Sequence, residues 1–380
     1  MSHRDDVNGV EISPNGSMLA TRSKDKSVML WSAVTGDAVR TFEGHTDWVS
    51  ALAFSPDSRT IASGGHDNNV FLYDVDGRSK IKMSGHSRAI VNVLFSPDNA
   101  KLGSYAYDRS IKVWDRQGQM LCNFEQHTRQ INAIQFSLDS TRLASASYDL
   151  TVGVYDIESH SLQHTLKGHI RSVDAVCFSP DGTAIVSGSK DRTLKVWDAI
   201  HGRLKITLRD HEEAIATVLF SQDGTRIISC TGRSVKIWDT ASGELLRAQN
   251  NVAPFVLDMN SSARWSSDGL MLVKQTAPGL PADQISYRYS RMMLRLSTSD
   301  VVEASQAPTI ALHAPNETEN HFAVNANLQW ITHDGENVLF LPGFLRPRVF
   351  VINGETIVLG NGTGRVMLFG FDHRYFGKSS

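Results

Sequence analysis

One histidine recurs along the chain at a nearly constant spacing. Successive copies are 41 or 42 residues apart, and they are His3, His45, His86, His127, His169 and His211. A fixed period of about 40 residues is the mark of stacked structural repeats. We therefore expect six copies of one structural unit in the first 250 residues, and this expectation constrains the fold more than any other feature.

Two further residue classes keep the same phase. A serine or threonine follows each histidine after 18 residues, at Thr21, Ser63, Ser104, Ser145, Ser187 and Ser229. An aromatic residue follows after 27 or 28 residues, at Trp31, Tyr73, Trp114, Tyr155, Trp197 and Trp238. Because three residue classes stay in register over two thirds of the chain, the repeat decides the fold class.

Each repeat contains short strands separated by turn signals. In the fifth repeat, the apolar residues 173–178 lead into Ser179-Pro180-Asp181-Gly182, where proline and glycine suit the second and last positions of a tight turn. Residues 185–187 and 194–198 follow, rich in β-branched and aromatic types. Strands of about five residues with turns every eight to twelve residues predict an all-β fold.

The chain resembles the WD-repeat β-propeller family in six dipeptides: Gly44-His45, Gly85-His86, Gly168-His169, Trp114-Asp115, Trp197-Asp198 and Trp238-Asp239. The resemblance implies a propeller of four-stranded antiparallel blades. It also implies a hydrogen-bonded chain inside each blade that joins the histidine, the serine or threonine, a turn aspartate and the tryptophan. The aspartates at the matching positions are Asp25, Asp67, Asp108, Asp149 and Asp191.

Three repeats depart from this pattern. Tyr73 and Tyr155 stand where the family has tryptophan, and we expect them to weaken the chain in their blades. The sixth repeat has no turn aspartate, because its turn from Cys230 to Arg233 is one residue short.

The C-terminal part limits the number of blades. The turn signature returns at residues 265–269, and residues 350–370 align without gaps on residues 178–198. We expect one propeller domain over residues 1–380, with six clear repeats in 1–250, a degenerate blade with insertions in 251–345 and a final degenerate blade in 346–372. We favour eight blades. Seven is the norm of the family, and nine would follow if the insertion held a full blade.

The same C-terminal part resembles a narrower group. Residues 329–332, 337–342 and 354–366 resemble the end of the WD-repeat region in fungal NACHT-type signalling NTPases of the vegetative-incompatibility kind. The sequence begins almost at the histidine of its first repeat and contains no nucleotide-binding portion. The chain is therefore expected to be a fragment of a larger signalling protein, a separate WD-repeat protein, or a ring that closes in another way.

The composition is that of a binding module inside the cell. A formal net charge of −2 argues against binding to a phosphate backbone, which requires a basic surface. No apolar run approaches the ~20 residues that span a bilayer, and the first ten residues do not form a signal peptide. Cys122, Cys177 and Cys230 are widely spaced and fit free thiols. We expect a cytoplasmic protein, with the nucleus as an alternative, and no contact with a membrane.

The search for catalytic motifs is negative. The chain contains no His-Glu-x-x-His, Cys-x-x-Cys or Gly-x-Ser-x-Gly motif, and the glycines from Gly360 to Gly364 lead into a strand where a dinucleotide loop needs a helix. One histidine per blade cannot converge on a zinc ion at ~2 Å. We expect no catalytic residue, cofactor or metal. The alternative is an enzyme with its active site at the mouth of the central channel.

Candidate binding residues come from positions that vary between repeats. The four expected strands of a blade are labelled a to d in chain order. The resemblance implies that the loops from strand d to the next strand a and from strand b to strand c meet on one face. The position before each turn aspartate holds Lys24, His66, Tyr107, Tyr148 and Lys190, and the position two after each repeat histidine holds Asp5, Asp47, Arg88, Arg129, Arg171 and Glu213.

We predict that this face binds a partner through Trp48, His66, Arg88, Tyr107, Arg129, Tyr148, Arg171 and Lys190. Tyrosine, tryptophan and arginine dominate binding hot spots, and guanidinium groups bind carboxylates and phosphates in pairs of hydrogen bonds. The expected partner is a protein or peptide, acidic or phosphorylated. The alternative is a solvated pattern of loop charges with aromatic residues at its edge.

Overall fold

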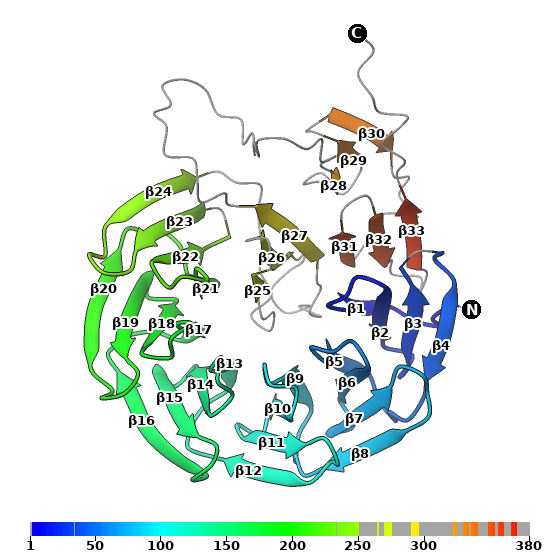
Figure 1. The fold of residues 1–380 in the computed structure, drawn as a ribbon, viewed down its shortest axis with the longest axis horizontal. Helices are drawn as coiled ribbons and strands as arrows, with labels where there is room; N and C mark the ends of the chain where they lie inside the picture. Colours follow the sequence, from blue (N-terminus) through cyan, green and yellow to red (C-terminus); the bar gives the residue numbers. More distant parts are fainter. Residues whose placement is uncertain are drawn as a thin grey trace.

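The computed structural model consists of β-strands and turns in its described part. It describes residues 2–33, 35–232 and 234–250, and beyond them the backbone of strands β25 to β33. No helix in this part of the chain has the length and hydropathy of a membrane-spanning segment. The strands follow one another around a ring, with the N-terminal strands on one side and β24 at the far end of the arc (Figure 1).

Six antiparallel four-stranded sheets make up residues 7–250, and we call them blades one to six. Blade one contains β1 (Val7–Ile12), β2 (Met18–Ser23), β3 (Val28–Ser32) and β4 (Ala38–Phe42). Blade two contains β5 (Val49–Phe54), β6 (Thr60–Gly65), β7 (Asn69–Asp74) and β8 (Lys80–Ser84). Blade three contains β9 (Ile90–Phe95), β10 (Lys101–Ala106), β11 (Ile111–Asp115) and β12 (Met120–Phe124).

The next three blades repeat this order. Blade four contains β13 (Ile131–Phe136), β14 (Arg142–Ser147), β15 (Thr151–Asp156) and β16 (Ser161–Lys167). Blade five contains β17 (Val173–Phe178), β18 (Ala184–Ser189), β19 (Thr193–Asp198) and β20 (Leu204–Arg209). Blade six contains β21 (Thr217–Phe220), β22 (Arg226–Cys230), β23 (Ser234–Asp239) and β24 (Leu245–Asn250).

Burial decreases from the innermost strand of a blade to the outermost, which we label a to d. Every residue of β17 and β18 is buried, whereas most residues of β20 are exposed or half-buried. Between blades five and six, Val186 and Leu194 pack in one core cluster with Leu219 and Ile227. Both faces of a blade are therefore covered by its neighbours, and the loops at the two ends of the ring are left to meet solvent.

The prediction of an all-β fold with four-stranded antiparallel blades is confirmed for the six repeats, which are arranged as in a β-propeller (Figure 1). The expectation of free thiols is also confirmed, because Cys122, Cys177 and Cys230 are unpaired and buried. Burial raises the pKa of the Cys122 thiol to about 11 and that of Cys230 to about 12.

Beyond residue 250 the structure describes two further sheets. The first joins β25 (Arg264–Trp265), β26 (Leu270–Gln275) and β27 (Ser290–Arg295) to β31 (Val349–Asn353), β32 (Thr356–Gly360) and β33 (Val366–Gly370), with one parallel pairing between β27 and β31. The second contains β28 (Phe322–Val324), β29 (Trp330–His333) and β30 (Glu336–Phe340). β31 and β32 lie next to β1 (Figure 1).

The gap-free alignment of residues 350–370 on 178–198 placed the first turn wrongly. It predicts a strand that ends at Phe350, but β31 continues to Asn353, which pairs with Thr356 of β32. The connection between these two strands is therefore shorter than the turn of a standard repeat. The remainder of the predicted insertion between residues 275 and 345 lies outside the described residues, apart from the strands named above.

Candidate functional site

The hydrogen-bonded chain expected in each blade is complete in blade five. His169 Nδ1 lies 2.8 Å from Asp191 Oδ2, and His169 Nε2 lies 2.8 Å from Ser187 Oγ. The indole of Trp197 donates to the same hydroxyl at 2.8 Å. Burial alone would raise the pKa of Asp191, but the hydrogen bonds from His169 and Thr193 hold it well below its ordinary value. The carboxylate is therefore ionised and fixed beside the imidazole.

The tyrosine blades have weaker chains, as the sequence predicts. In blade four the hydroxyls of Ser145 and Tyr155 are 3.3 Å apart, compared with 2.8 Å between Trp197 and Ser187 in blade five. In blade two the buried Tyr73 hydroxyl makes no hydrogen bond of good geometry within the described residues, although Ser63 is near enough to act on its pKa.

Blade six keeps the inner part of the chain and lacks the aspartate. His211 Nε2 lies 2.6 Å from Ser229 Oγ, and Trp238 donates to that oxygen at 2.8 Å. Within the described residues, His211 Nδ1 contacts only the hydroxyl of Ser234, at 3.2 Å. Burial, and then the charge of Lys236, lower the pKa of His211 to about 4. This imidazole is neutral at physiological pH.

Backbone hydrogen bonds hold the d–a loop and the b–c turn of each blade together. In blade five, the Asp191 carboxylate also accepts the amide of Ile170 at 3.1 Å, and the amide of Lys190 donates to the carbonyl of Ser172 at 2.9 Å. The same bond joins Tyr107 to Ala89, Tyr148 to Gln130, and His66 to Trp48. The two kinds of loop therefore share one end of the ring, which we call the loop face.

The three predicted arginines are exposed on the loop face of consecutive blades. Arg88, Arg129 and Arg171 stand in the d–a loops of blades three, four and five. Among the described residues, none of their guanidinium groups makes a hydrogen bond or an ion pair. Their charges are thus available to a partner.

The structure brings Tyr148 and Lys190 together across blades four and five. The Lys190 ammonium lies 2.7 Å from the Tyr148 hydroxyl and 4.6 Å from the centre of its ring. It also lies 3.9 Å from Asp174, a buried carboxyl whose pKa burial raises. Burial lowers the pKa of Lys190, but Tyr148 and Asp174 outweigh this effect and raise it above its ordinary value. Lys190 is therefore already engaged within the protein.

The remaining predicted residues lie nearer blade two. Trp48 is 41% exposed, and its ring centre lies 5.5 Å from that of the exposed His66. The ammonium of Lys24 lies 4.8 Å from the Trp48 ring. Tyr107 is half-buried and packs against the core between blades three and four. The predicted set thus divides into a group around Trp48 and a group around Tyr148, with Tyr107 between them in the order of the blades.

Two exposed apolar residues on this face were missed. Ile170 is 80% exposed in the d–a loop of blade five, and Leu150 is 38% exposed in the b–c turn of blade four, with a φ of 74°. In blades two and three, the residues at the position of Leu150 are polar and bind the following d–a loop. Asn68 donates to the carbonyl of Ser87 at 3.4 Å, and Arg109 donates to the carbonyl of Thr128 at 3.0 Å. Comparing the positions one after each repeat histidine would have shown that Ile170 is exceptional.

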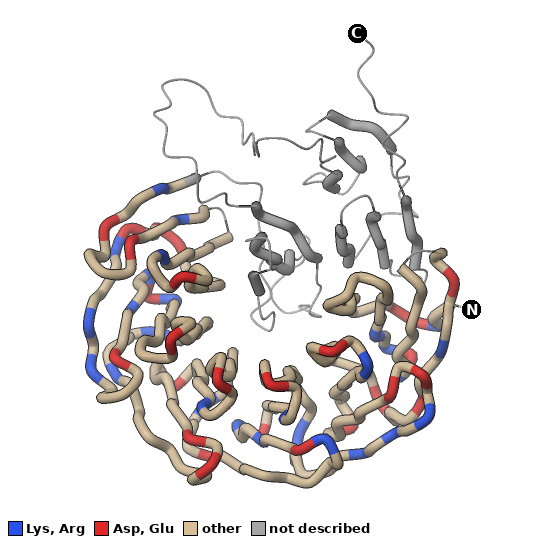
Figure 2. The backbone as a smooth tube through the Cα atoms, in the orientation of Figure 1, with Lys and Arg blue, Asp and Glu red and all other residues tan. Residues whose placement is uncertain are grey.

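Acidic and basic residues are both spread over the six blades (Figure 2). In the part of the chain that the structure describes, no group of three or more histidine, cysteine, aspartate or glutamate side chains could hold a metal ion.

Curated proteins share short segments with this chain. Nuclear distribution protein PAC1 of Arthroderma benhamiae is 44% identical over 61 residues, which are 16% of this chain and 13% of that protein. WD repeat and SOCS box-containing protein 1 of Danio rerio is 40% identical over 78 residues, which are 20% of this chain and 18% of that protein. The matches thus span less than a fifth of the length of either relative.

A family model provides the wider match. The model described as "WD domain, G-beta repeat" matches six segments: residues 1–32, 36–74, 77–115, 118–156, 160–198 and 202–239. These segments end within or next to the third strand of blades one to six, and together they cover more than half of the chain. The repeat histidines, their serine or threonine partners and the six described blades agree with this match, and the chain belongs to the WD-repeat family.

Proposed function

We propose that this chain is a non-enzymatic interaction module that binds a protein or peptide on the loop face of blades three to five. WD-repeat proteins generally act as scaffolds for protein interactions. The observation that carries the proposal is that Arg88, Arg129 and Arg171 are exposed and unpaired among the described residues. Three unpaired cations on neighbouring loops contribute no described polar contact to the fold, and their charges are free to bind a partner.

The chemistry of these side chains favours an acidic or phosphorylated partner. A guanidinium group binds a carboxylate or phosphate through two parallel hydrogen bonds. Leu150 and Ile170 add exposed apolar surface to the loops of blades four and five. Tyr148 and the arginines are of the residue types that are enriched in binding hot spots. Lys190 is expected to contribute less, because Tyr148 and Asp174 already engage its ammonium.

Capture from cell lysate followed by charge reversal tests this proposal. The main partner is first identified by mass spectrometry with the unmodified chain as bait. The double variant Arg129→Glu and Arg171→Glu should then lose that partner and keep its melting temperature. The matched control is Arg78→Glu with Arg203→Glu, because both residues are exposed in c–d turns at the other end of the ring. Retention of the partner by the loop-face variant, or equal loss in the control, would remove this face as the binding site.

For the ring itself, we propose eight blade positions in one domain. The support is that β25–β27 and β31–β33 follow blade six in order and that β31 and β32 lie next to β1. Deleting residues 344–380 should then uncover the side of blade one that holds Val7 and Val10, and exposed sheet faces aggregate. A truncated chain that stays monomeric and unfolds cooperatively would contradict this proposal.

We also propose that the chain acts in the cytoplasm as the ligand-sensing part of a NACHT-type signalling system. The support is the resemblance of residues 329–366 to the C-terminal WD-repeat region of such proteins. A fluorescent fusion should be cytoplasmic, and immunoprecipitation from the source cells should recover a nucleotide-binding NACHT segment in the same chain or a bound one. Recovery of neither would contradict the signalling role.

A further inference from the structure

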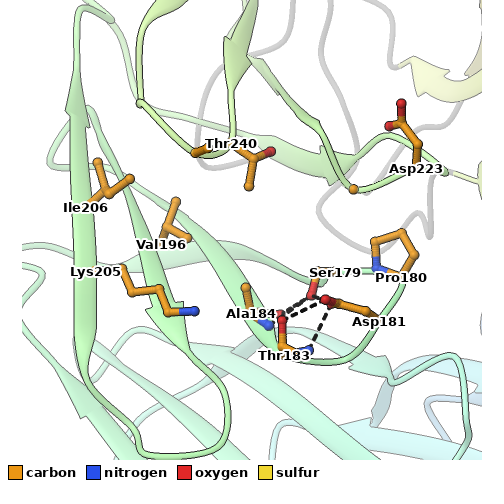
Figure 3. Close-up of a pocket in the computed structure, with 12 residues that line it drawn as sticks. Ser179, Pro180, Asp181, Thr183, Ala184, Val196, Lys205, Ile206, Asp223 and Thr240 are labelled. Atoms are coloured by element: carbon orange, nitrogen blue, oxygen red, sulfur yellow. Dashed lines mark hydrogen bonds between the residues drawn. The ribbon is translucent and has the colours of Figure 1, made fainter.

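A cavity of about 490 Å³ opens between blades five and six, at the end of the ring opposite the loop face. We call this end the turn face, because a–b and c–d turns form it. The a–b turns of both blades line the cavity, together with Val196, Lys205 and Ile206 of blade five and the c–d turn of blade six (Figure 3). Ligand pockets of proteins have volumes of about 300 to 1,000 Å³.

At the preceding interface, between blades four and five, a basic side chain occupies the equivalent place. Arg142 begins β14 of blade four, and its Nη2 donates to the carbonyl of Gly182 in blade five at 2.6 Å. Its guanidinium carbon lies 5.3 Å from the centre of the Phe178 ring. One blade earlier, Lys101 begins β10 and reaches the carbonyl of Ser140 at 3.3 Å. A cation at this position thus bridges two successive interfaces.

Blade five has alanine at the same position. Arg142 pairs with Asp156 in the register of blade four, and Ala184 pairs with Asp198 in the register of blade five. A second bridging residue is also replaced, since Ile206 stands where blade four has His164, whose Nε2 lies 2.8 Å from the carbonyl of Ile200. The cavity is therefore the volume that two polar side chains occupy between blades four and five.

The carbonyl that would serve an arginine at this position is still present in blade six. Gly224 matches Gly182 in the repeat, and no hydrogen bond within the described residues reaches its carbonyl. Asp181 and Asp223 add two carboxylates, and hydrogen bonds from the side chains and backbone of their own turns lower both pKa values. The buried Thr240 hydroxyl in the cavity wall also makes no hydrogen bond to a described residue.

One basic side chain stands among the residues that line the cavity. Lys205 is exposed in the wall of the cavity, and its side chain is long and flexible (Figure 3). Two carboxylates against one ammonium leave the cavity net negative. A cationic ligand fits this balance, and Arg142 at the preceding interface shows that a planar guanidinium fits this place in the repeat.

We propose that this cavity binds an arginine side chain of a partner protein, which enters between blades five and six as Arg142 does between blades four and five. The site is separate from the loop face and does not depend on the function proposed for that face. The ring then has a second binding site at its other end. This site prefers a basic group, whereas the loop face prefers an acidic one.

The proposal is tested by titrating the full chain with N-acetyl-arginine amide, followed by NMR or calorimetry. Saturable binding with one site per chain is expected, at least tenfold tighter than for the citrulline analogue, which has the same shape without the charge. Free L-arginine should bind no tighter than the capped amide. No saturable binding, equal affinity for the citrulline analogue, or a preference for free arginine would overturn a site for a partner's side chain.

Variants locate the site. Ala184→Arg supplies the missing guanidinium from within the chain and should abolish binding without lowering the melting temperature, because Arg142 shows that the repeat accepts arginine at this position. Ala100→Arg is the matched control, since it adds the same charge to an exposed a–b turn of blade three. Lys205→Gln should strengthen binding severalfold and Asp223→Asn should weaken it. Unchanged binding in Ala184→Arg overturns the proposal, and if that variant does not fold, unchanged binding in both of the others does so.

Discussion

Blades five and six each contain four strands, but the hydrogen-bonded chain of side chains ends at a different group in each blade. In both blades the histidine lies within 2.8 Å of a serine hydroxyl that also accepts the indole of a tryptophan. Blade five adds Asp191, which accepts hydrogen bonds from the His169 ring and the Ile170 amide. Blade six lacks the carboxylate and still forms its sheet. The comparison shows that the sheet forms without the aspartate, whereas the aspartate binds the b–c turn to the d–a loop.

The largest difference between the two blades is expected on removal of the histidine. His169→Ala should cost about 3 kcal/mol, because it removes one hydrogen bond each from Asp191 and Ser187, and a lost charged hydrogen bond costs more than a neutral one. His211→Ala should cost about 1 kcal/mol, since it leaves only hydroxyl groups. Chemical denaturation of both variants measures the difference, and equal losses would break the comparison.

Acid should act on blade six at a higher pH than on blade five. The pKa of His211 is about 4 in the folded state and about 6.5 when unfolded, so the unfolded state binds the proton first. Stability should fall by about 2 kcal/mol between pH 7 and pH 5. The pKa of Asp191 is lowered on folding, so its contribution is complete above about pH 4 and is lost only below that value. Denaturation of wild type and His211→Asn across this range tests both statements, and the variant should show the flatter profile.

Asp191→Asn should convert blade five toward the state of blade six. The amide keeps the shape of the side chain and removes its charge, so a loss of about 1 kcal/mol is expected from the weakened bonds to His169 and Ile170. Amide hydrogen exchange should speed up at Ile170 and stay unchanged in β18. Faster exchange throughout the sheet would mean that the aspartate supports the strands and not only the loops.

The smallest effect is expected in blade two. Within the described residues the buried Tyr73 hydroxyl makes no hydrogen bond of good geometry, so Tyr73→Phe should change the stability by less than about 0.5 kcal/mol or increase it slightly. Trp197→Phe, which breaks a bond of 2.8 Å to Ser187, is the contrasting variant and should destabilise clearly. A large loss in Tyr73→Phe would show that its hydroxyl matters to the blade.

The features that recur in every repeat could be predicted from the sequence. The strands, the chain from His169 to Trp197 and the shared face of the loops depend on residues within one repeat, and their spacing is constant. The engagement of Lys190 by Tyr148 and the cavity beside Ala184 could not be predicted, because both depend on which side chains reach across from a neighbouring blade. After residue 250 the period is lost, and even an alignment without gaps misplaced the end of β31.

The bonds that fix the loop face have a practical consequence for protein engineering. Asp191 is bound through the His169 ring and a main-chain amide, and Lys190 is held through its own main-chain amide. None of these bonds uses the side chain of a residue that varies between repeats. The variable positions can therefore be randomised in a library while the frame stays constant, so that new specificities are selected from this ring without redesigning its core.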